Sequence, residues 1–230
     1  MSVIDIDPDL PQPELGTGDG ASVYERLRRD IIEGHVPANA RLKVRELATR
    51  FGVSTNPVRE ALQQSRGQGL VVIEPNRGAR VRPVDEKCVH DTGEIEALIE
   101  PFLTHWFVGI ATLADLERLE AIQAEIEALD FRSLEAHNAL DADFHRLIYE
   151  RHPNTHLLEL WWNHRDVLGA VVRGLDVTLT RRSAVIREHR AIIACIKAHD
   201  ADGAAAVVRD HVQGASRMWI DQLRANRRFG

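Results

Sequence analysis

One aspartate and three histidines in the C-terminal half of the chain have spacings that could bring their side chains together. Asp141 and His145 lie four residues apart in LDADFHRLI, which places both on one face of a helix. His189 occurs in REHRAII and His211 in RDHVQGA. One carboxylate and three imidazoles would suit Zn²⁺, Ni²⁺ or another borderline divalent ion, and an open coordination position could receive an oxygen of a small molecule.

The two later histidines meet only if their helices are antiparallel around a turn near residues 200–203. His189 lies about 16 Å before that turn and His211 about 12 Å after it, at about 1.5 Å per residue, so both can reach one level. Asp143 is a weaker candidate, because its spacing points it away from His145. A single histidine is more often a surface or packing residue. We interpret the following histidines in that way: His105, His137, His152, His156, His164 and His199.

The elements that must position these residues are helices. From residue 85 the apolar pattern has a period near 3.6 and shows no persistent strand-like alternation. Thr112, Ser133 and Ser183 fit N-cap roles, while Pro153 and Gly203 indicate turns. We expect an antiparallel all-α bundle. Its helices are predicted at about 85–109, 112–129, 133–151, 154–179, 182–198 and 202–226.

The N-terminal third has a different pattern, with three short helices followed by a hairpin. Gly52 can make the tight turn between the second and third helices, because a left-handed conformation costs glycine little. The order predicts a winged helix-turn-helix, so the fold class is mainly α, with this module followed by the bundle. The helices are predicted at 21–34, about 43–50 and about 54–68, with strands at 70–73 and 79–82 and a connector at 35–42.

The third of these helices has a polar N-terminus suited to a DNA groove. Ser54, Thr55 and Asn56 are good N-cap types, Pro57 is tolerated in a first turn, and Arg59 follows one turn later. Arginine can bind guanine in a bidentate manner, and asparagine can do the same for adenine. For any one residue, a solvated side chain on a surface helix is the alternative. The complete order of helices, turn and hairpin favours DNA binding.

The charge distribution agrees with that interpretation. Residues 21–84 hold 12 Lys or Arg against 6 Asp or Glu, although the whole chain has a net charge of -6. A basic excess confined to one segment suits the neutralisation of phosphates. We therefore expect three parts: a flexible acidic tail at 1–20, the winged module at 21–84, and a bundle at 85–230 that binds a metal and an effector and forms the dimer.

Composition also indicates where the protein works. No apolar run approaches the roughly 18 residues that a membrane span requires. The first 20 residues are acidic and lack the apolar segment of a secretory signal. Cys88 and Cys195 do not resemble a disulfide framework, and reduced thiols in a cytoplasm are the better interpretation. We expect a cytoplasmic protein that does not bind a membrane.

The winged module resembles the GntR family of bacterial transcription regulators. GVSTNPVREAL, then GLV, then PNRGARV occur in the family's order and spacing over about residues 21–84. Thr55 stands where arginine is usual and Ser65 where leucine is common, which suggests altered operator preference or affinity. The resemblance implies that the DNA contacts are made by Arg45, Thr55, Asn56, Arg59, Asn76, Arg77 and Gly78.

The helical part resembles the FCD domain of the FadR subfamily over about residues 85–225. The matching pattern is D-x-x-F-H, then E-H-x-x-I, then a histidine 22 residues later. The resemblance implies that Asp141, His145, His189 and His211 are metal ligands. It also implies that the domain dimerises and binds a small organic acid near the metal.

One departure concerns the effector, because Glu96 aligns with an arginine that could hold a carboxylate. Asn163, Arg165 or Arg173 could replace that arginine, or the effector could be neutral or cationic.

These features favour a homodimeric, ligand-responsive regulator that binds double-stranded operator DNA and a small-molecule effector. Repression that the effector relieves is favoured over activation. The alternative is a metal-dependent hydrolase that carries a nucleic-acid-binding domain. No positioned general base and no glycine-rich phosphate loop accompanies the metal motif, so we do not expect an enzyme. Two further roles for the metal stay open: it could be the signal itself, or a structural brace of the bundle.

Overall fold

The computed structural model describes residues 22–75, 77–83, 85–129, 132–172, 175 and 177–229. The predicted tail at 1–20, Asn76 and Arg173 lie outside these described residues. Contacts divide the chain into two units. We call residues 1–85 with 163–173 the N-terminal unit, and residues 86–162 with 174–230 the bundle unit. The domain limits predicted at residues 84 and 85 stay predictions.

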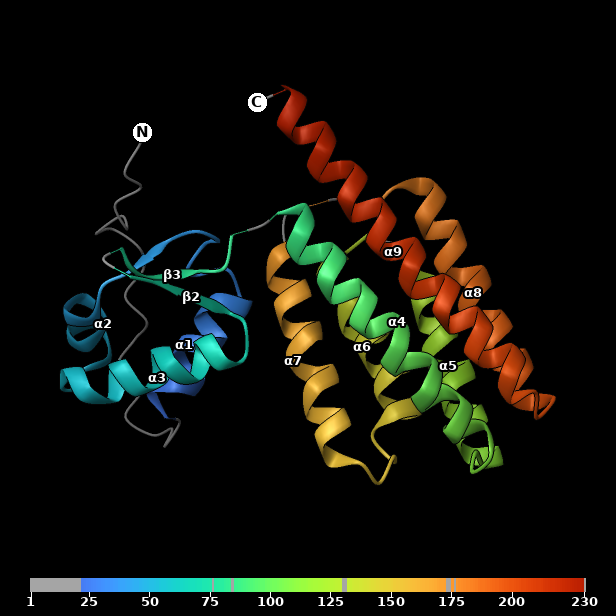
Figure 1. Ribbon diagram of the computed structural model, residues 1–230. Helices are drawn as coiled ribbons and strands as arrows, with labels where there is room; N and C mark the ends of the chain where they lie inside the picture. The colour runs from blue at the N-terminus through green and yellow to red at the C-terminus, as the bar shows by residue number, and fades with distance from the viewer. Residues whose placement is uncertain are drawn as a thin grey trace. The chain divides into compact units, whose positions relative to one another are not determined.

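The N-terminal unit contains a winged helix-turn-helix, as the sequence predicts (Figure 1). Its sheet has three antiparallel strands in the order β1-β3-β2, one strand more than the predicted hairpin. The extra strand lies in the predicted connector, where buried Leu42 pairs with Ala79 of β3. The elements are α1 (Val23–Ile32), β1 (Arg41–Leu42), α2 (Val44–Phe51), α3 (Thr55–Gly67), β2 (Val71–Glu74) and β3 (Gly78–Val81).

Local sequence explains where these helices begin and end. Ser22 and Glu25 form a capping box at the start of α1, in which each side chain accepts a bond from the other residue's backbone N–H. Gly52 ends α2 with a φ of 67°, a left-handed conformation that turns the chain toward α3. Leu27, Leu47 and similar apolar side chains then fill the core between the helices and the sheet.

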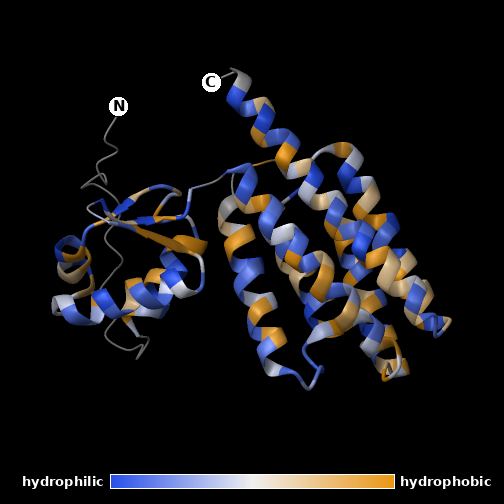
Figure 2. Cartoon of the chain, viewed as in Figure 1, coloured by the Kyte–Doolittle hydropathy of each residue, from blue (hydrophilic) through white to orange (hydrophobic). Residues whose placement is uncertain are grey.

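The bundle unit is all-helical, in agreement with the predicted fold class. Within it α4 packs against α9 and α6, while α8 packs against α9 and α5 (Figure 1). Apolar and polar residues are mixed along these helices (Figure 2), and the buried apolar ones of α4, α5, α6, α8 and α9 pack into one core. The helices are α4 (Glu86–Val108), α5 (Leu113–Leu129), α6 (Leu134–Tyr149), α7 (Thr155–Val172), α8 (Leu179–Lys197) and α9 (Ala201–Phe229), with the end of α7 in the N-terminal unit.

Two predicted boundaries in the bundle are wrong. The helix predicted at 154–179 ends at Val172, and α8 begins at Leu179 because the Thr178 side chain accepts a bond from the Arg181 N–H. Ser183, predicted as an N-cap, therefore lies inside α8. Gly203 lies in the first turn of α9, and its N–H is bonded by the Asp200 side chain.

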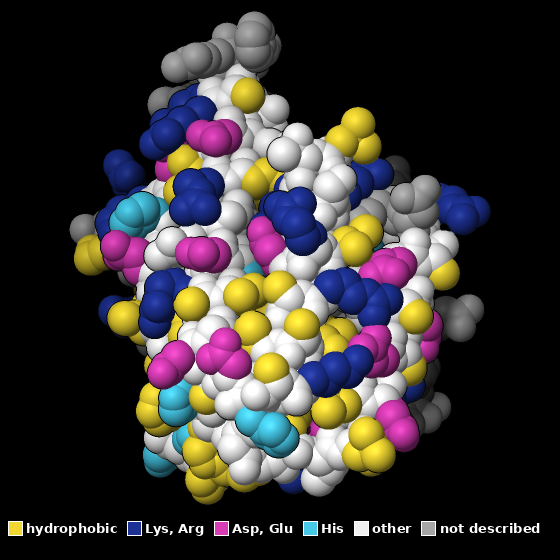
Figure 3. All heavy atoms as spheres, turned by 90° about the vertical axis from the view of Figure 1, so that its right-hand side faces the viewer, with side chains coloured by type: hydrophobic (Ala, Val, Ile, Leu, Met, Phe, Trp, Pro, Cys, Tyr) yellow, Lys and Arg dark blue, Asp and Glu magenta, His cyan; other side chains and the backbone are white. Residues whose placement is uncertain are grey.

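The outer surface of the bundle is charged in both signs. On the face seen in Figure 3, Lys and Arg side chains are interspersed with Asp and Glu around apolar ones. Between α5 and α8, Arg190 forms ion pairs with Glu120 and Glu127. Among the residues that the structure describes, no helix combines the length and the apolar character that crossing a membrane requires.

Candidate metal centre and nucleic-acid interface

The bundle unit brings together the four side chains that the sequence predicts as metal ligands. Asp141 and His145 come from α6, His189 from α8 and His211 from α9. One ligand atom from each lies within 4.8 Å of all the others. Asp141 Oδ1 lies 3.5 Å from His189 Nε2 and 3.9 Å from His145 Nε2. The three imidazoles are buried and the carboxylate is half-buried, so the cluster belongs to the interior of the bundle.

A chain of hydrogen bonds fixes the tautomer of His189. Its Nδ1 lies 2.9 Å from Gln123 Oε1. The Gln123 amide nitrogen donates to Glu127 at 2.9 Å, which turns the amide oxygen toward the imidazole. Arg190 holds Glu127 with bonds of 2.7 and 2.9 Å. Nδ1 of His189 therefore carries the proton, and the lone pair of Nε2 faces Asp141.

The other two imidazoles are held in the same way. His211 Nδ1 lies 2.8 Å from a carboxylate oxygen of Glu188, which can only accept, so Nδ1 donates. His145 Nδ1 lies 3.2 Å from the hydroxyl of Tyr149, whose own proton is donated to Glu100 at 3.0 Å. The Tyr149 oxygen thus accepts from His145. In all three histidines Nδ1 is engaged outward, which leaves Nε2 for the centre.

The donor set fits a divalent metal ion. The Nε2 atom of fully buried His189 has no hydrogen-bond partner among the described residues, although its lone pair is available. Phe144 stacks on this ring with centroids 4.2 Å apart and so fixes its plane. Zinc takes imidazole nitrogens and carboxylate oxygens at about 2 Å, with about four ligands in all. Asp141, His145, His189 and His211 have the types and separations that such a site requires.

The pKa values of two residues in and beside the cluster favour the binding of a cation. The pKa of His189 is lowered to about 3, chiefly by burial and next by the neighbouring His211, while Asp141 opposes both. His189 is therefore neutral near pH 7 and keeps its lone pair. Burial alone would raise the pKa of Glu188, but hydrogen bonds from His211 and Arg181 lower it overall. Glu188 is thus an anion beside the centre, as its acceptor role requires.

Several residues around the centre escape sequence reasoning. Gln123 is fully buried inside an apolar stripe of α5, and a polar residue at such a position is a usable signal. Tyr149 follows His145 by four residues and so shares its helical face. Glu100 is a buried acid in the apolar helix α4. Arg181, also buried, donates to Glu188 at 2.7 Å and to the His211 carbonyl at 2.8 Å, and no spacing rule indicates it.

The residues predicted to contact an effector fall in both units, and their role stays a prediction. Glu96 is buried in α4 of the bundle unit. Asn163 and Arg165 are half-buried in the part of α7 that groups with the N-terminal unit. Arg173 lies outside the described residues. Within the described bundle unit, Arg181 contacts the predicted ligand His211 and is a further candidate neighbour of an anionic group.

Replacement of His211 by alanine is expected to remove one ligand and to lower zinc affinity by more than about tenfold. His199→Ala is the control, since this histidine is exposed in the α8–α9 turn. Competition titration with a chromophoric chelator and metal analysis of the purified protein measure the effect. Wild-type zinc content in the His211 variant would rule out this assignment.

The predicted DNA-binding residues form an exposed polar surface in the N-terminal unit. Ser54 and Asn56 are exposed at the start of α3, and Thr55 and Pro57 are half-buried beside them. Ser54 is the N-cap residue, yet its side chain makes no capping bond, and the first turn has no acidic residue. The partial positive charge of the helix N-terminus is therefore available to a phosphate or a base edge.

Arg59 is oriented for this surface by a neighbour in the same helix. Its guanidinium donates to Asn56 Oδ1 at 3.2 Å, and both side chains are exposed. Arg45 is exposed on α2. Such a pair can present both the arginine and the amide to bases in one groove.

The wing adds a second exposed arginine to the predicted DNA-binding surface. Gly78 has a φ of 78° and makes the sharp turn between β2 and β3 possible. Arg77 beside it has a side chain that is 80% exposed. Asn76 lies outside the described residues. Sequence reasoning missed exposed Arg41 of β1, which donates to the Arg77 carbonyl at 3.4 Å, because β1 itself was not predicted.

A recognition helix with a free N-terminus beside a basic wing defines a DNA-binding protein, here joined to a helical domain with a polar centre. Residues 20–81 match the family described as bacterial regulatory proteins, gntR family, and residues 91–214 match the FCD domain. The chain belongs to the GntR family of transcription regulators and carries an FCD domain. It is thus a regulator with an effector-binding domain and not an enzyme, which removes the hydrolase alternative.

Named relatives agree with this assignment. The chain is 26% identical to the HTH-type transcriptional repressor RspR of Escherichia coli K12, over 88% of this chain and 89% of the relative. It is 28% identical to the HTH-type transcriptional repressor GlaR of the same strain, over 82% and 90%. Among solved structures, E. coli McbR/YncC has a TM-score of 0.70 at 20% identity, covering 87% of this chain and 96% of that one. This last likeness shows the fold alone.

Loss of the Arg59 guanidinium is expected to weaken operator binding by about 1–3 kcal/mol if it contacts a base. If it contacts phosphate, the loss is smaller and equal for all sequences. Fluorescence anisotropy of Arg59→Ala on specific and scrambled duplexes distinguishes the two. Arg118→Ala, which removes the same charge from an exposed site on α5, is the control. Unchanged binding by the Arg59 variant would contradict a role in the interface.

Proposed function

We propose that this chain is a homodimeric repressor that binds operator DNA and releases it when a small metabolite enters a metal-centred site in the bundle. The observation that carries the proposal is the set of three buried imidazoles and one carboxylate, whose ligand atoms all lie within 4.8 Å of one another. Two relatives, RspR and GlaR, are transcriptional repressors, which supports the sense of regulation.

The metal centre would hold Zn²⁺ or Ni²⁺ through Asp141, His145, His189 and His211. Such an ion supplies an open coordination position for an oxygen of the metabolite. Arg181 would balance negative charge at the His211 side of the site, while Gln123 and the other outer partners keep each ligand oriented. A metabolite shifts the regulator only if it binds one arrangement of the protein more tightly than the other.

The operator would be bound by α3 and the wing, through Arg45, Ser54, Thr55, Asn56, Pro57, Arg59, Arg77 and Gly78. Asn76 completes this predicted set. Two such modules in a dimer bind two half-sites related by a two-fold axis, so a pseudo-palindromic operator follows.

A dimer is favoured by apolar side chains exposed on α4. Leu98 is 76% exposed and Phe102 58% exposed, and their spacing of four residues places them on one face. Exposed apolar residues that are grouped rather than scattered are typical of an interaction surface. In a two-fold dimer the same surface of each subunit meets its copy, so α4 would pack on α4 of the partner.

The function is tested by anisotropy titration against a duplex from the region upstream of the chain's own gene. We expect sequence-selective binding that differs between zinc-loaded and chelated protein, and a bound divalent ion in metal analysis. A thermal-shift screen of metabolites on the zinc-loaded protein then identifies the effector. Absence of selective DNA binding, with or without metal, would refute the proposal.

The dimer is tested by introducing charge into the proposed contact. The double variant Leu98→Asp, Phe102→Asp is expected to be monomeric, because each apolar side chain would lose about 1.5–3 kcal/mol of burial. Analytical ultracentrifugation measures the change. Leu179→Asp, at a residue 78% exposed at the start of α8, serves as the control. A double variant that remains dimeric would place the interface elsewhere.

A further inference from the structure

Helix α7 belongs to both units of the protein. It is one uninterrupted helix from Thr155 to Val172. Its residues up to Trp162 group with the bundle, and those from Asn163 group with the winged module. A helix transmits a displacement along its axis, because its backbone hydrogen bonds make it stiff. The contacts at each end of α7 therefore determine whether a change in the bundle can alter the winged module.

At the bundle end, one buried carboxylate joins α7 to a predicted metal ligand. The indole Nε1 of Trp161 donates to Glu100 Oε1 at 2.8 Å. The Tyr149 hydroxyl donates to the other oxygen, Oε2, at 3.0 Å and accepts from His145 Nδ1 at 3.2 Å. None of these four side chains is accessible beyond a few per cent, so water does not compete for these bonds. The Glu100 carboxylate therefore links α7, through Trp161, to His145, through Tyr149.

At the other end, α7 contacts the winged module at two places. Asp166 forms an ion pair with Arg28 of α1. Burial raises the pKa of Asp166, and Arg28 offsets part of that rise. A methyl group placed on Gly69 would lie 3.7 Å from a Val167 methyl, so α7 packs against the backbone at this glycine. Gly69 follows Gln68, the C-cap of α3, so the contact adjoins the end of the recognition helix.

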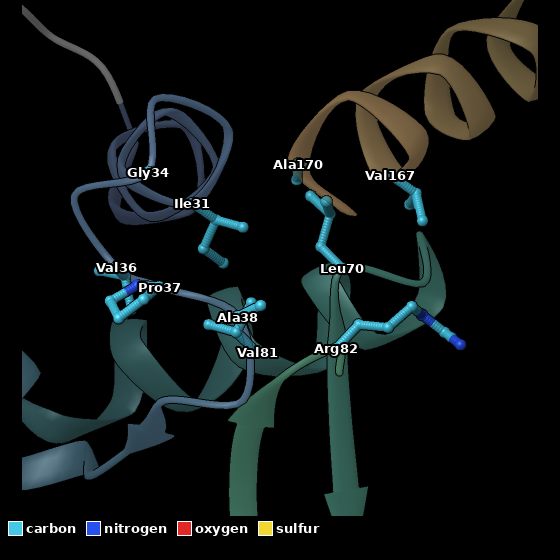
Figure 4. A pocket seen from close by; sticks show the side chains of 10 residues that line it. All are labelled: Ile31, Gly34, Val36, Pro37, Ala38, Leu70, Val81, Arg82, Val167 and Ala170. Carbon is cyan, nitrogen blue, oxygen red and sulfur yellow. The ribbon is translucent and has the colours of Figure 1, made fainter. Parts of the chain in front are cut away.

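The apolar part of this contact is loosely packed. A cavity of about 160 Å³ lies between α7 and the module. Figure 4 shows Val167 and Ala170 of α7 on one side of it and Ile31 and Leu70 on the other. Side chains that line such a pocket make fewer contacts with protein than side chains in a closed core. The ion pair between Asp166 and Arg28 is therefore an important part of what holds α7 on the module.

We propose that α7 couples the metal centre to DNA binding, with Glu100 and Trp161 as the positioning residues that transmit the state of His145. The inference rests on the proposed function. An imidazole coordinated through Nε2 donates more strongly from Nδ1. The hydrogen bond from His145 to the Tyr149 hydroxyl then becomes stronger. This changes the bond from Tyr149 to Glu100, and with it the bond from Trp161 to the same carboxylate. A shift of α7 alters its contacts at Arg28 and Gly69, beside the recognition helix.

The test compares Trp161→Phe with Trp219→Phe, a half-buried tryptophan of α9. The first substitution keeps an aromatic ring and removes the N–H donor to Glu100. Operator affinity is measured by anisotropy with zinc-loaded and chelated protein. We expect wild type and Trp219→Phe to show an affinity ratio of about fivefold or more between the two states. In Trp161→Phe we expect a ratio within about twofold of one, with zinc stoichiometry unchanged.

Because Trp161 is fully buried, a second variant tests the far end of the helix without disturbing the core. Asp166→Asn keeps the shape of the side chain and removes its charge opposite Arg28, and Asp221→Asn on exposed α9 is the control. We expect Asp166→Asn to lose the zinc-dependent ratio while binding zinc as wild type does.

The outcomes separate the two proposals. A wild-type protein that binds no zinc would overturn the proposed function. If zinc binds but both Trp161→Phe and Asp166→Asn keep the wild-type ratio, the coupling runs elsewhere and the inference is overturned. A wild-type ratio of one would overturn the inference as well, and the metal site would stand. Loss of the ratio in both variants, with zinc bound and both controls unchanged, supports α7 as the coupling element.

Discussion

Three imidazoles of one buried cluster can bind a common cation only where each aims the lone pair of one ring nitrogen at the same point. The structure meets this condition by giving every Nδ1 an acceptor outside the cluster. Gln123, Glu188 and Tyr149 supply those acceptors from different directions. The helices that contribute the ligands and their partners must therefore hold their register closely. The packing of the helical domain is therefore constrained by the need to place an acceptor opposite each Nδ1–H of these histidines.

Sequence patterns predicted the winged module, the bundle and the four clustered side chains, because each depends on local periodicity or spacing. Asp141 and His145 needed only the helical repeat, and His189 and His211 needed only a turn between antiparallel helices. The boundary at Thr178 was missed because a threonine cap competes with a long apolar pattern. Strand β1 was missed because a two-residue strand exists only through its pairing with β3.

The surroundings of the site were harder to predict, since they depend on tertiary contacts. Glu100 and Trp161 are 61 residues apart in sequence, and Arg190 of α8 bonds to Glu127 of α5. No local signal links such pairs. The effector contact of Arg165 stays a prediction, because it was suggested by charge alone. Residue type indicates what a side chain can do, and only the packing decides which neighbours it acts on.

The hydrogen-bond series behind His189 ends at Arg190, whose side chain is 40% exposed. The basicity of His189, a proposed ligand, is thus influenced by a guanidinium at the surface, where salt screens its charge. At the proposed metal site, substitutions of Arg190 would change metal preference without altering any proposed ligand, and such changes cost little stability at exposed positions. Evolution would then have a route to new metal selectivity that leaves the four clustered side chains intact.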